Sequence, residues 1–242
     1  EHAPELAGRL TLTVVSDEET FGPNGATHLF TERAADVTGT ACLNGEPSSL
    51  RLVRFGEKGG QWFRFTVRTR GGHGAFPHLG PNAIEQSYAL IERLREFCAT
   101  EPEEPPEVAG ALDDVASLYD KMFGAGAGRG LRSVTMNVGT IEGGPKVNMI
   151  ATTCRFEVDF RLPIGVEPAA LRSWIDACCT GLDVTVEQLL DNHPNWCAPG
   201  NDLARAVQRR AATLTGIEPA EATALGNCDA RLWRYRDVPA VV

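Results

Sequence analysis

Hydrophobic and polar residues recur along the chain with strand-like or helix-like spacing, and the pattern changes from region to region. Residues Arg9–Val15 read RLTLTVV, an alternation that predicts a β-strand. A short helix is expected over Ala26–Arg33 and a second small apolar strand over Thr38–Leu43. Both strands run into carboxylate-bearing turns, and strand ends are where open α/β sheets collect their ligands. The start of the chain therefore has α/β character.

A different pattern begins after residue 56. Gln61–Arg70 alternates polar with aromatic or aliphatic residues, which predicts a half-exposed strand of an antiparallel sheet. Asn82–Cys98 has the spacing of an amphipathic helix. The residues expected on its apolar face are Ile84, Tyr88, Ile91, Leu94 and Phe97. Thr100–Pro106 is acidic and rich in proline, which favours a solvated connection.

The following segments complete an α+β unit. Strands are expected over Leu131–Ile141, Ala151–Leu162 and Val184–Leu189, and a helix over Glu167–Cys179, with Pro168 suited to its first turn. The resulting order β-α-β-β-α-β is the split unit of ferredoxin-like folds. The middle of the chain is therefore predicted to be a sandwich-like α+β unit.

The end of the chain returns to α/β character. A long helix is expected over residues 202–216, followed by a loop at Gly226–Arg231. We therefore expect three segments: residues 1–56 as the first part of an α/β domain, residues 57–192 as an inserted α+β domain, and residues 193–242 as the second part of the α/β domain.

Composition excludes two classes of partner. The 242 residues include 23 Lys and Arg against 32 Asp and Glu, a formal net charge of −9, which argues against a nucleic-acid surface or a polybasic membrane patch. No stretch approaches the roughly 18 apolar residues of a membrane span. Seven cysteines without a C-x-x-C pair predict reduced thiols in a cytoplasmic protein.

The strand-end acids are the first candidates for chemistry. Asp17, Glu18 and Glu19 close the first predicted strand, and Glu46 follows the second. Such residues are ordinarily a solvated loop and a turn. If they converge, however, their mutual repulsion favours a bound cation, and one carboxylate left unligated could act as a general base beside it. Oxygen-rich ligation with a few histidines fits Zn²⁺, Co²⁺ or Mn²⁺.

Other candidates carry two interpretations each. His73 lies between glycines in a loop and is either solvent-exposed or functional. Arg161 ends a strand, where it could pair with an acid or bind a ligand. Asn82 could be the N-cap of the helix that follows. His28 is interpreted as a packing or surface residue and His78 as structural or turn-capping. Asp229 and Arg231 could buttress the site or form a structural ion pair.

Four ordered motifs resemble a known family. They are Ser16–Glu19 with Gly45–Pro47, then Thr69–Ile84, then Gly139–Pro163, and finally Gly226–Arg231. Together and in this order they resemble the metal-dependent amidohydrolases that include acetylornithine deacetylase, succinyl-diaminopimelate desuccinylase, aminoacylase and glutamate carboxypeptidase. The resemblance implies an α/β fold, with a partial zinc-peptidase-like catalytic domain and an inserted α+β ferredoxin-like dimerisation domain, or lid.

The family also implies roles for the candidates. Glu18 would be the general base, Glu19 a ligand of one divalent metal ion and Glu46 a ligand of a second. Zinc is expected, with cobalt or manganese as alternatives. His73 would reach across a homodimer to stabilise the oxyanion. The residues expected to bind an N-acyl amino acid or small peptide are Arg161, Asn148 and Asn82.

The sequence departs from the family pattern at both ends. Complete members contribute a His and a bridging Asp before the acid pair and a final His near the C-terminus, and these positions have no match here. We therefore expect a chain truncated at both ends and inactive as given. The alternatives are a non-catalytic homologue that keeps only lid-mediated dimerisation, or a ferredoxin-like module that binds a small ligand.

Overall fold

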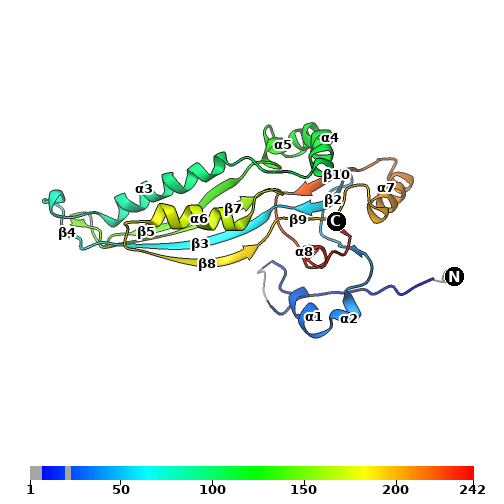
Figure 1. The fold of residues 1–242 in the computed structure, drawn as a ribbon, viewed down its shortest axis with the longest axis horizontal. Coiled ribbons are helices and arrows are strands. Elements are labelled where there is room, and N and C mark those ends of the chain that lie inside the picture. The colour runs from blue at the N-terminus through cyan, green and yellow to red at the C-terminus, as the bar shows by residue number, and fades with distance from the viewer. Residues whose placement is uncertain (1–6, 20–22) are drawn as a thin grey trace. The chain divides into compact units, whose positions relative to one another are not determined.

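A computed structural model describes residues 7–19 and 23–242 and is drawn in Figure 1. The chain forms two compact units. Unit 1 comprises Glu1–Phe55, Trp196–Glu221 and Cys228–Val242, and unit 2 comprises Gly56–Asn195 and Ala222–Asn227. Each unit is described by itself.

Unit 2 is built on a four-stranded antiparallel sheet with the order β5-β7-β3-β8. The strands are β3 (Gly59–Arg68), β5 (Thr135–Gly143), β7 (Thr153–Leu162) and β8 (Val184–Asn192). Helix α3 (Ala83–Arg95) follows β3, and α6 (Pro168–Cys179) follows β7. This confirms the predicted β-α-β-β-α-β order, including the proline in the first turn of α6.

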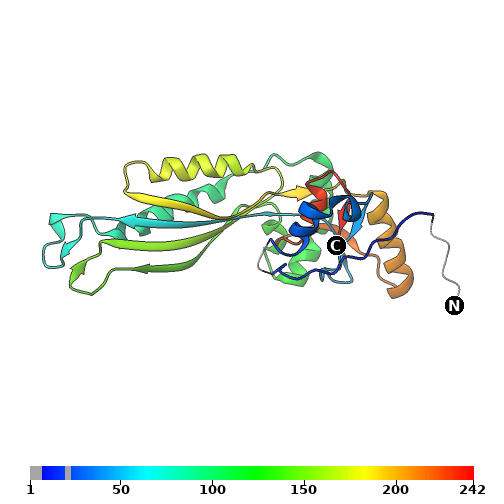
Figure 2. The same cartoon turned by 90° about the horizontal axis from the view of Figure 1, so that it is seen from below.

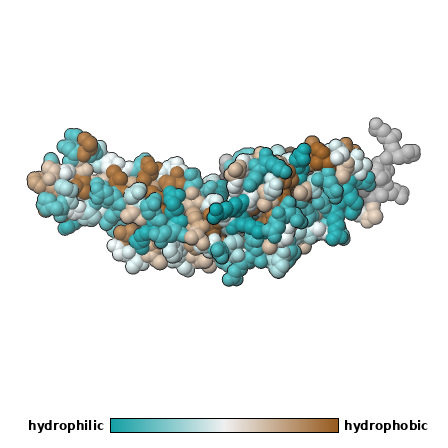
Figure 3. All heavy atoms as spheres, turned by 90° about the horizontal axis from the view of Figure 1, so that it is seen from above, coloured by the Kyte–Doolittle hydropathy of each residue, from teal (hydrophilic) through white to brown (hydrophobic). Residues whose placement is uncertain are grey.

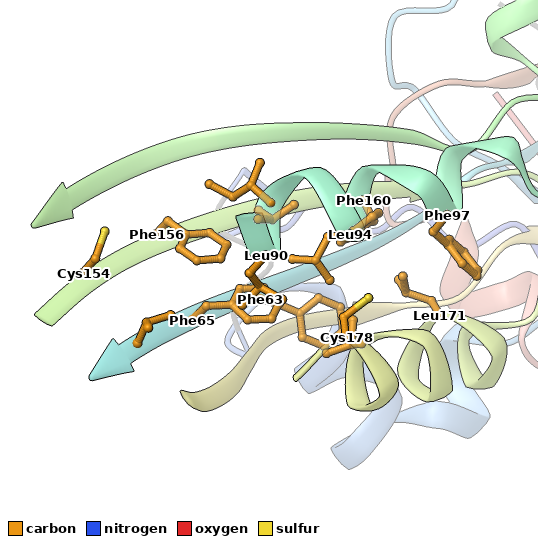
Figure 4. Close-up of a cluster of buried hydrophobic side chains, with 14 of the residues drawn as sticks. Phe63, Phe65, Leu90, Leu94, Phe97, Cys154, Phe156, Phe160, Leu171 and Cys178 are labelled. Carbon is orange, nitrogen blue, oxygen red and sulfur yellow. The ribbon is translucent and has the colours of Figure 1, made fainter. Parts of the chain in front are cut away.

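Both helices lie on one side of this sheet (Figures 1 and 2). The alternation in β3 sends Phe63, Phe65 and Val67 toward the helices, where they are buried. Phe65 stacks on its cross-strand partner Phe156, with ring centroids 4.8 Å apart. These rings join α3 and α6 side chains in one continuous core, shown in Figure 4. The opposite face of the sheet, here called the open face, carries the polar residues of the same strands.

The predicted apolar face of α3 is partly wrong. Ile91 and Leu94 are buried, but Ile84 is 41% exposed and Tyr88 is 67% exposed. The core side of the helix is instead completed by Ala83, Ser87 and Leu90. Spacings of mostly three residues fall short of the 3.6-residue turn, so the predicted stripe drifts around the helix and leaves the core at one end.

Unit 2 contains further elements that lie, along the sequence, between these strands and helices. Strand β4 (Gly72–His73) pairs with β6 (Met149–Ile150), and two short 3₁₀ segments span Pro77–Leu79 and Glu96–Ala99. Helices α4 (Pro106–Phe123) and α5 (Ala127–Gly130) were not predicted. The signal for α4 was present in helical spacing, because its buried residues are Val108, Leu112, Val115 and Tyr119.

Unit 1 consists mainly of short elements. They are α1 (Ala26–Glu32), α2 (Ala34–Val37), β1 (Cys42–Leu43), α7 (Asp202–Thr215), α8 (Arg231–Arg234) and β11 (Ala240–Val241). The predicted helices at α1 and α7 are confirmed. Strands β1 and β11 pair in parallel. A three-stranded sheet has the order β10-β2-β9 and consists of β2 (Leu52–Glu57), β9 (Asn195–Trp196) and β10 (Ala220–Ala224).

The predicted strand at Arg9–Val15 is wrong. This segment has no regular secondary structure, and Leu10, Leu12 and Val14 are 81%, 86% and 87% exposed. Its alternation suits a strand, but a strand also needs a neighbour to pair with, and the described residues provide none there. The described residues also include no helix with the length and apolarity needed to cross a membrane.

Candidate functional site

The acidic candidates lie in unit 1 and act on one another electrostatically. Burial raises the pKa of the Glu18 carboxyl above its ordinary value, and the nearby carboxylates of Asp229, Glu46 and Glu19 raise it further. The guanidinium of Arg231 opposes this effect. Glu18, Glu19, Glu46 and Asp229 are called the acid group below. They come from three separate segments of the sequence.

Local turns hold two parts of the acid group. Asp17 has a positive φ of 72°, and its carboxylate accepts a hydrogen bond from the Asn24 N–H at 3.1 Å. Left-handed backbone is tolerated by Asp when its short side chain bonds locally, and this turn leads directly into Glu18. The amide oxygen of Asn44 accepts from the Glu46 N–H at 2.7 Å, an Asx turn that fixes the backbone of Glu46.

Asp229, for which a buttressing role at the site or a structural ion pair was predicted, is a member of the acid group. Its ion pair with Arg231 is confirmed, with 3.3 Å between Asp229 Oδ1 and Arg231 Nη1, and both side chains are nearly buried. Burial raises the pKa of Asp229, and the guanidinium partly offsets this. The ion pair therefore adds a buried carboxylate near Glu18 together with its own counter-charge.

The acid group fits a divalent cation only in part. Three carboxylates repel that of Glu18, a charge environment that a cation relieves, and oxygen donors suit Zn²⁺ or Mn²⁺. Across residues 7–19 and 23–242, however, no cluster of three or more His, Cys, Asp or Glu side chains is arranged to hold a metal ion. The described residues thus offer charge and some ligands, but not a complete ligand set.

His73 lies in unit 2 on β4, which pairs with β6 in a two-stranded antiparallel sheet, called the β4–β6 ribbon below. The N–H of Gly74 donates to the Asn148 carbonyl at 2.8 Å, so the two candidates His73 and Asn148 lie at the same ribbon. Gly71 has a φ of 65°, and a Cβ there would lie 2.3 Å from Thr152 Cγ2, so the close approach requires glycine. The Ala75 N–H donates to His73 Nδ1 at 3.1 Å. A neutral His73 therefore carries its proton on Nε2 and can donate outward.

Asn82 caps helix α3, and this alternative is confirmed. Its Oδ1 accepts a hydrogen bond from the Ile84 N–H at 2.9 Å. The side chain of Asn148, the residue before β6, is exposed. One of the two asparagine candidates is therefore occupied in holding a helix end, whereas the other is accessible.

Arg161 lies near the end of β7 with its side chain 22% exposed. Its Nε donates to Asp159 at 2.9 Å, which confirms the ion-pair alternative, and its Nη1 donates to Asn227 Oδ1 at 3.0 Å. The amide group of Asn227 donates in turn to the Lys58 carbonyl. Asn227 belongs to the Gly226–Arg231 loop, and no role was predicted for it.

Arg161 and the β4–β6 ribbon lie at opposite ends of the unit 2 sheet. Arg161 pairs in register with Gly60, whereas Thr153 pairs with Arg68 next to the ribbon. At about 3.4 Å per residue, the eight steps from Arg161 to Thr153 span roughly 27 Å. Within one chain, the two side chains are too far apart to contact the same small molecule.

One groove of about 640 Å³ lies on the open face of the sheet near the β4–β6 ribbon. Its lining includes Arg68, Arg155 and Glu142, and Arg155 pairs with Glu142 at 2.5 Å. None of the candidate residues lines it. We therefore do not place the chemistry in this groove.

Residues 55–185, more than half of the chain, match the peptidase dimerisation domain of the M20 family. The chain belongs to the M20 peptidase family. It is 27% identical over 239 residues to the succinyl-diaminopimelate desuccinylase of Cereibacter sphaeroides, covering 94% of this chain and 56% of that protein. A desuccinylase of Variovorax paradoxus is also 27% identical, with coverages of 94% and 55%. The chain thus spans about half the length of the curated M20 relatives it matches.

Solved structures share the fold. An M20 family metallo-carboxypeptidase from Sulfolobus solfataricus superposes with a TM-score of 0.70 at 16% identity, covering 93% of this chain and 60% of that one. A tripeptidase from Staphylococcus aureus gives 0.67 at 17% identity, covering 94% and 53%. The predicted M20-type fold, an α/β catalytic part with an inserted ferredoxin-like domain, is thereby confirmed.

Proposed function

We propose that this protein acts in metal-dependent hydrolysis of an amide bond in an N-acyl amino acid or a small peptide. The observation that carries the proposal is the M20 match, supported by relatives named as desuccinylases and a metallo-carboxypeptidase. The acid group adds physical support, because it gathers carboxylates from three segments of the sequence around Glu18. Each of the seven cysteines carries a thiol, which suits the reducing cytoplasm that we also propose.

Glu18 is assigned as the general base and acid. Its carboxylate takes a proton from the attacking water and then delivers it to the departing amine, and its raised pKa makes it a stronger base for the first step. Glu19 and Glu46 would each help to hold one of two divalent ions, zinc, cobalt or manganese. When bound, these ions supply Lewis-acid activation of water and of the scissile carbonyl.

His73 is assigned as the oxyanion donor. Because Nδ1 accepts the Ala75 N–H, the neutral ring presents Nε2–H, the form needed to stabilise developing negative charge. His73 lies in a glycine-rich segment and its side chain is exposed to solvent. Arg161 is assigned to the substrate carboxylate and Asn148 to substrate orientation, while Asn82 keeps its cap and would have at most an indirect role.

The separation of about 27 Å between Arg161 and Thr153, which lies next to the β4–β6 ribbon, supports a homodimer. If His73 and Arg161 act on one small substrate, they come from different chains. Unit 2 also has surfaces suited to a second copy, because β5 is an edge strand of its sheet. Ile141 on this strand is 54% exposed, and Ile84 and Tyr88 of α3 are exposed as well. Figure 3 shows brown hydrophobic patches breaking the hydrophilic surface.

The test is hydrolysis of N-succinyl and N-acetyl amino acids by the complete gene product with added Zn²⁺ or Mn²⁺. We expect turnover that falls by about 10² to 10⁴-fold in Glu18→Gln, with Glu32→Gln on the exposed end of α1 as the control. Mixing His73→Ala with Arg161→Ala chains should restore part of the activity that each lacks alone. Dimerisation without hydrolysis would favour the non-catalytic alternative instead.

A further inference from the structure

The guanidinium of Arg161 is held from two sides. Asp159 occupies the Nε edge at 2.9 Å, and Asn227 Oδ1 occupies one N–H of Nη1 at 3.0 Å. A guanidinium has five N–H donors, so three remain, all at the Nη end. No other acceptor among the described residues contacts them. The end that remains available matches a single carboxylate in an end-on arrangement.

Asn227 is fixed in the orientation that this contact requires. Its amide nitrogen donates to the Lys58 carbonyl, so its oxygen must face Arg161. With the amide reversed, the nitrogen would face the guanidinium and both hydrogen bonds would be lost. The main chain at Lys58 thereby sets the direction of Arg161 through Asn227.

Gly60 makes room for this arrangement. It pairs with Arg161 across the β3–β7 ladder, so any side chain there would lie beside the guanidinium. A Cβ at residue 60 would lie 2.5 Å from Asn227 Oδ1 and 3.2 Å from Arg161 Nη1. The first distance is well inside van der Waals contact, so even alanine would push Asn227 and Arg161 apart.

Asp159 sets the charge of the same end. Its carboxylate, 29% exposed, already pairs with the guanidinium, so a bound anion would meet a cation that is partly neutralised. A carboxylate ligand is then held by directed hydrogen bonds more than by net charge. Such binding is selective for geometry and weak enough to let a carboxylate product leave.

We propose that Asn227 and Gly60 are positioning residues that aim the Nη end of Arg161 at one carboxylate of the ligand, and that Asp159 moderates the strength of this contact. The inference rests on the proposed role of Arg161 in binding a substrate carboxylate. It adds a residue from the Gly226–Arg231 loop and a glycine of β3 to that site.

The first measurement is ¹⁵N NMR of arginine side chains in the ligand-free protein, with the Arg161 signals assigned from Arg161→Lys. We expect slow rotation of the Arg161 guanidinium in the wild type and fast rotation in Asn227→Ala and Gly60→Ala. The control Asn137→Ala removes an exposed asparagine from β5, in the same sheet. Unchanged Arg161 signals in both Asn227→Ala and Gly60→Ala would overturn the positioning role, whatever the protein binds.

The second measurement is succinate affinity by calorimetry, with succinamide as the uncharged comparison. Asn227→Ala and Gly60→Ala should weaken succinate binding by about three- to tenfold. Asp159→Asn, which keeps an acceptor for Nε but removes the charge, should strengthen it, whereas Glu157→Gln beside Arg64 should change nothing. A purely structural role for Asp159 predicts weakening instead, which would contradict the proposal. If Arg161→Lys leaves succinate affinity unchanged, the proposed substrate role of Arg161 fails, and the NMR result still decides the positioning role.

Discussion

The strands of unit 2 are paired over much longer stretches than the strands of unit 1. In unit 2, β3 and β7 pair over their full length, and aromatic side chains fill one continuous core. In unit 1, β1 and β11 pair over two residues each, and the apolar residues form two small clusters. The difference shows that an alternating sequence produces a strand only where long-range partners cover both its backbone and its apolar face.

The largest expected effect comes from the core of unit 2. Phe156→Ala removes a fully buried ring that stacks on Phe65, and such truncations cost about 3–5 kcal/mol. Urea denaturation should show this loss in the free energy of unfolding. A loss below about 1 kcal/mol would mean that the core of unit 2 is no better packed than an exposed surface.

A second effect, up to about 3 kcal/mol, concerns Lys58 at the start of unit 2. Its Nζ donates to the Gly130 and Ser133 carbonyls, and burial lowers the pKa of Lys58 to about 8. In the unfolded chain, Lys58 keeps its proton up to its ordinary pKa of about 10.4. The free energy of unfolding therefore increases as the pH rises between the folded-state and unfolded-state pKa values of Lys58. Subtracting the pH profile of Lys58→Met from that of the wild type should show this rise. Parallel profiles would contradict it.

Helix caps allow an equal comparison of the two units. Asn82 caps α3 in unit 2 and Asn201 caps α7 in unit 1, with hydrogen bonds of 2.9 and 3.1 Å. Replacing either by alanine should cost about 1 kcal/mol in thermal or chemical unfolding. If Asn82→Ala also leaves succinate affinity unchanged, Asn82 is a cap alone. A selective loss of affinity would restore its predicted substrate role.

The smallest expected effect is in unit 1. Leu12→Ser, at a residue that is 86% exposed, should change the free energy of unfolding by no more than about 0.5 kcal/mol. The matched change Phe65→Ser in the alternating strand β3 should cost several times more, because Phe65 is fully buried. A large cost at Leu12 would show that the apolar face of residues 9–15 is covered in solution.

Local patterns predicted the parts of the fold whose signals are complete within a short segment. Alternation predicted β3 and β7, a proline in the first turn marked α6, and Gly216, with a φ of 72°, marked the end of α7. The strand at residues 9–15 failed because pairing is not a local property. Helix α4 was not predicted although its apolar spacing is helical, because Pro105 and Pro106 at its start also favour a loop.

The candidate site was predictable in part. The motifs indicated Glu18, Glu46, His73 and Arg161 and predicted that Glu18, Glu19 and Glu46 meet, but they did not predict a contact between Asn227 and Arg161. The positions of Asp229 near Glu18 and of Asn227 beside Arg161 depend on the chain returning from residue 226 onward, far from either in sequence. Long-range contacts of this kind leave no periodic signal.

We propose that Glu19 and Glu46 meet Glu18 around divalent cations. The most direct test is Zn²⁺ binding to the complete gene product, measured by equilibrium dialysis for the wild type, Glu19→Gln, Glu46→Gln and the control Glu32→Gln. We predict that each of the first two substitutions weakens Zn²⁺ binding by at least about tenfold, and that the control leaves it unchanged. Zn²⁺ affinities that are equal in all four proteins would contradict the account.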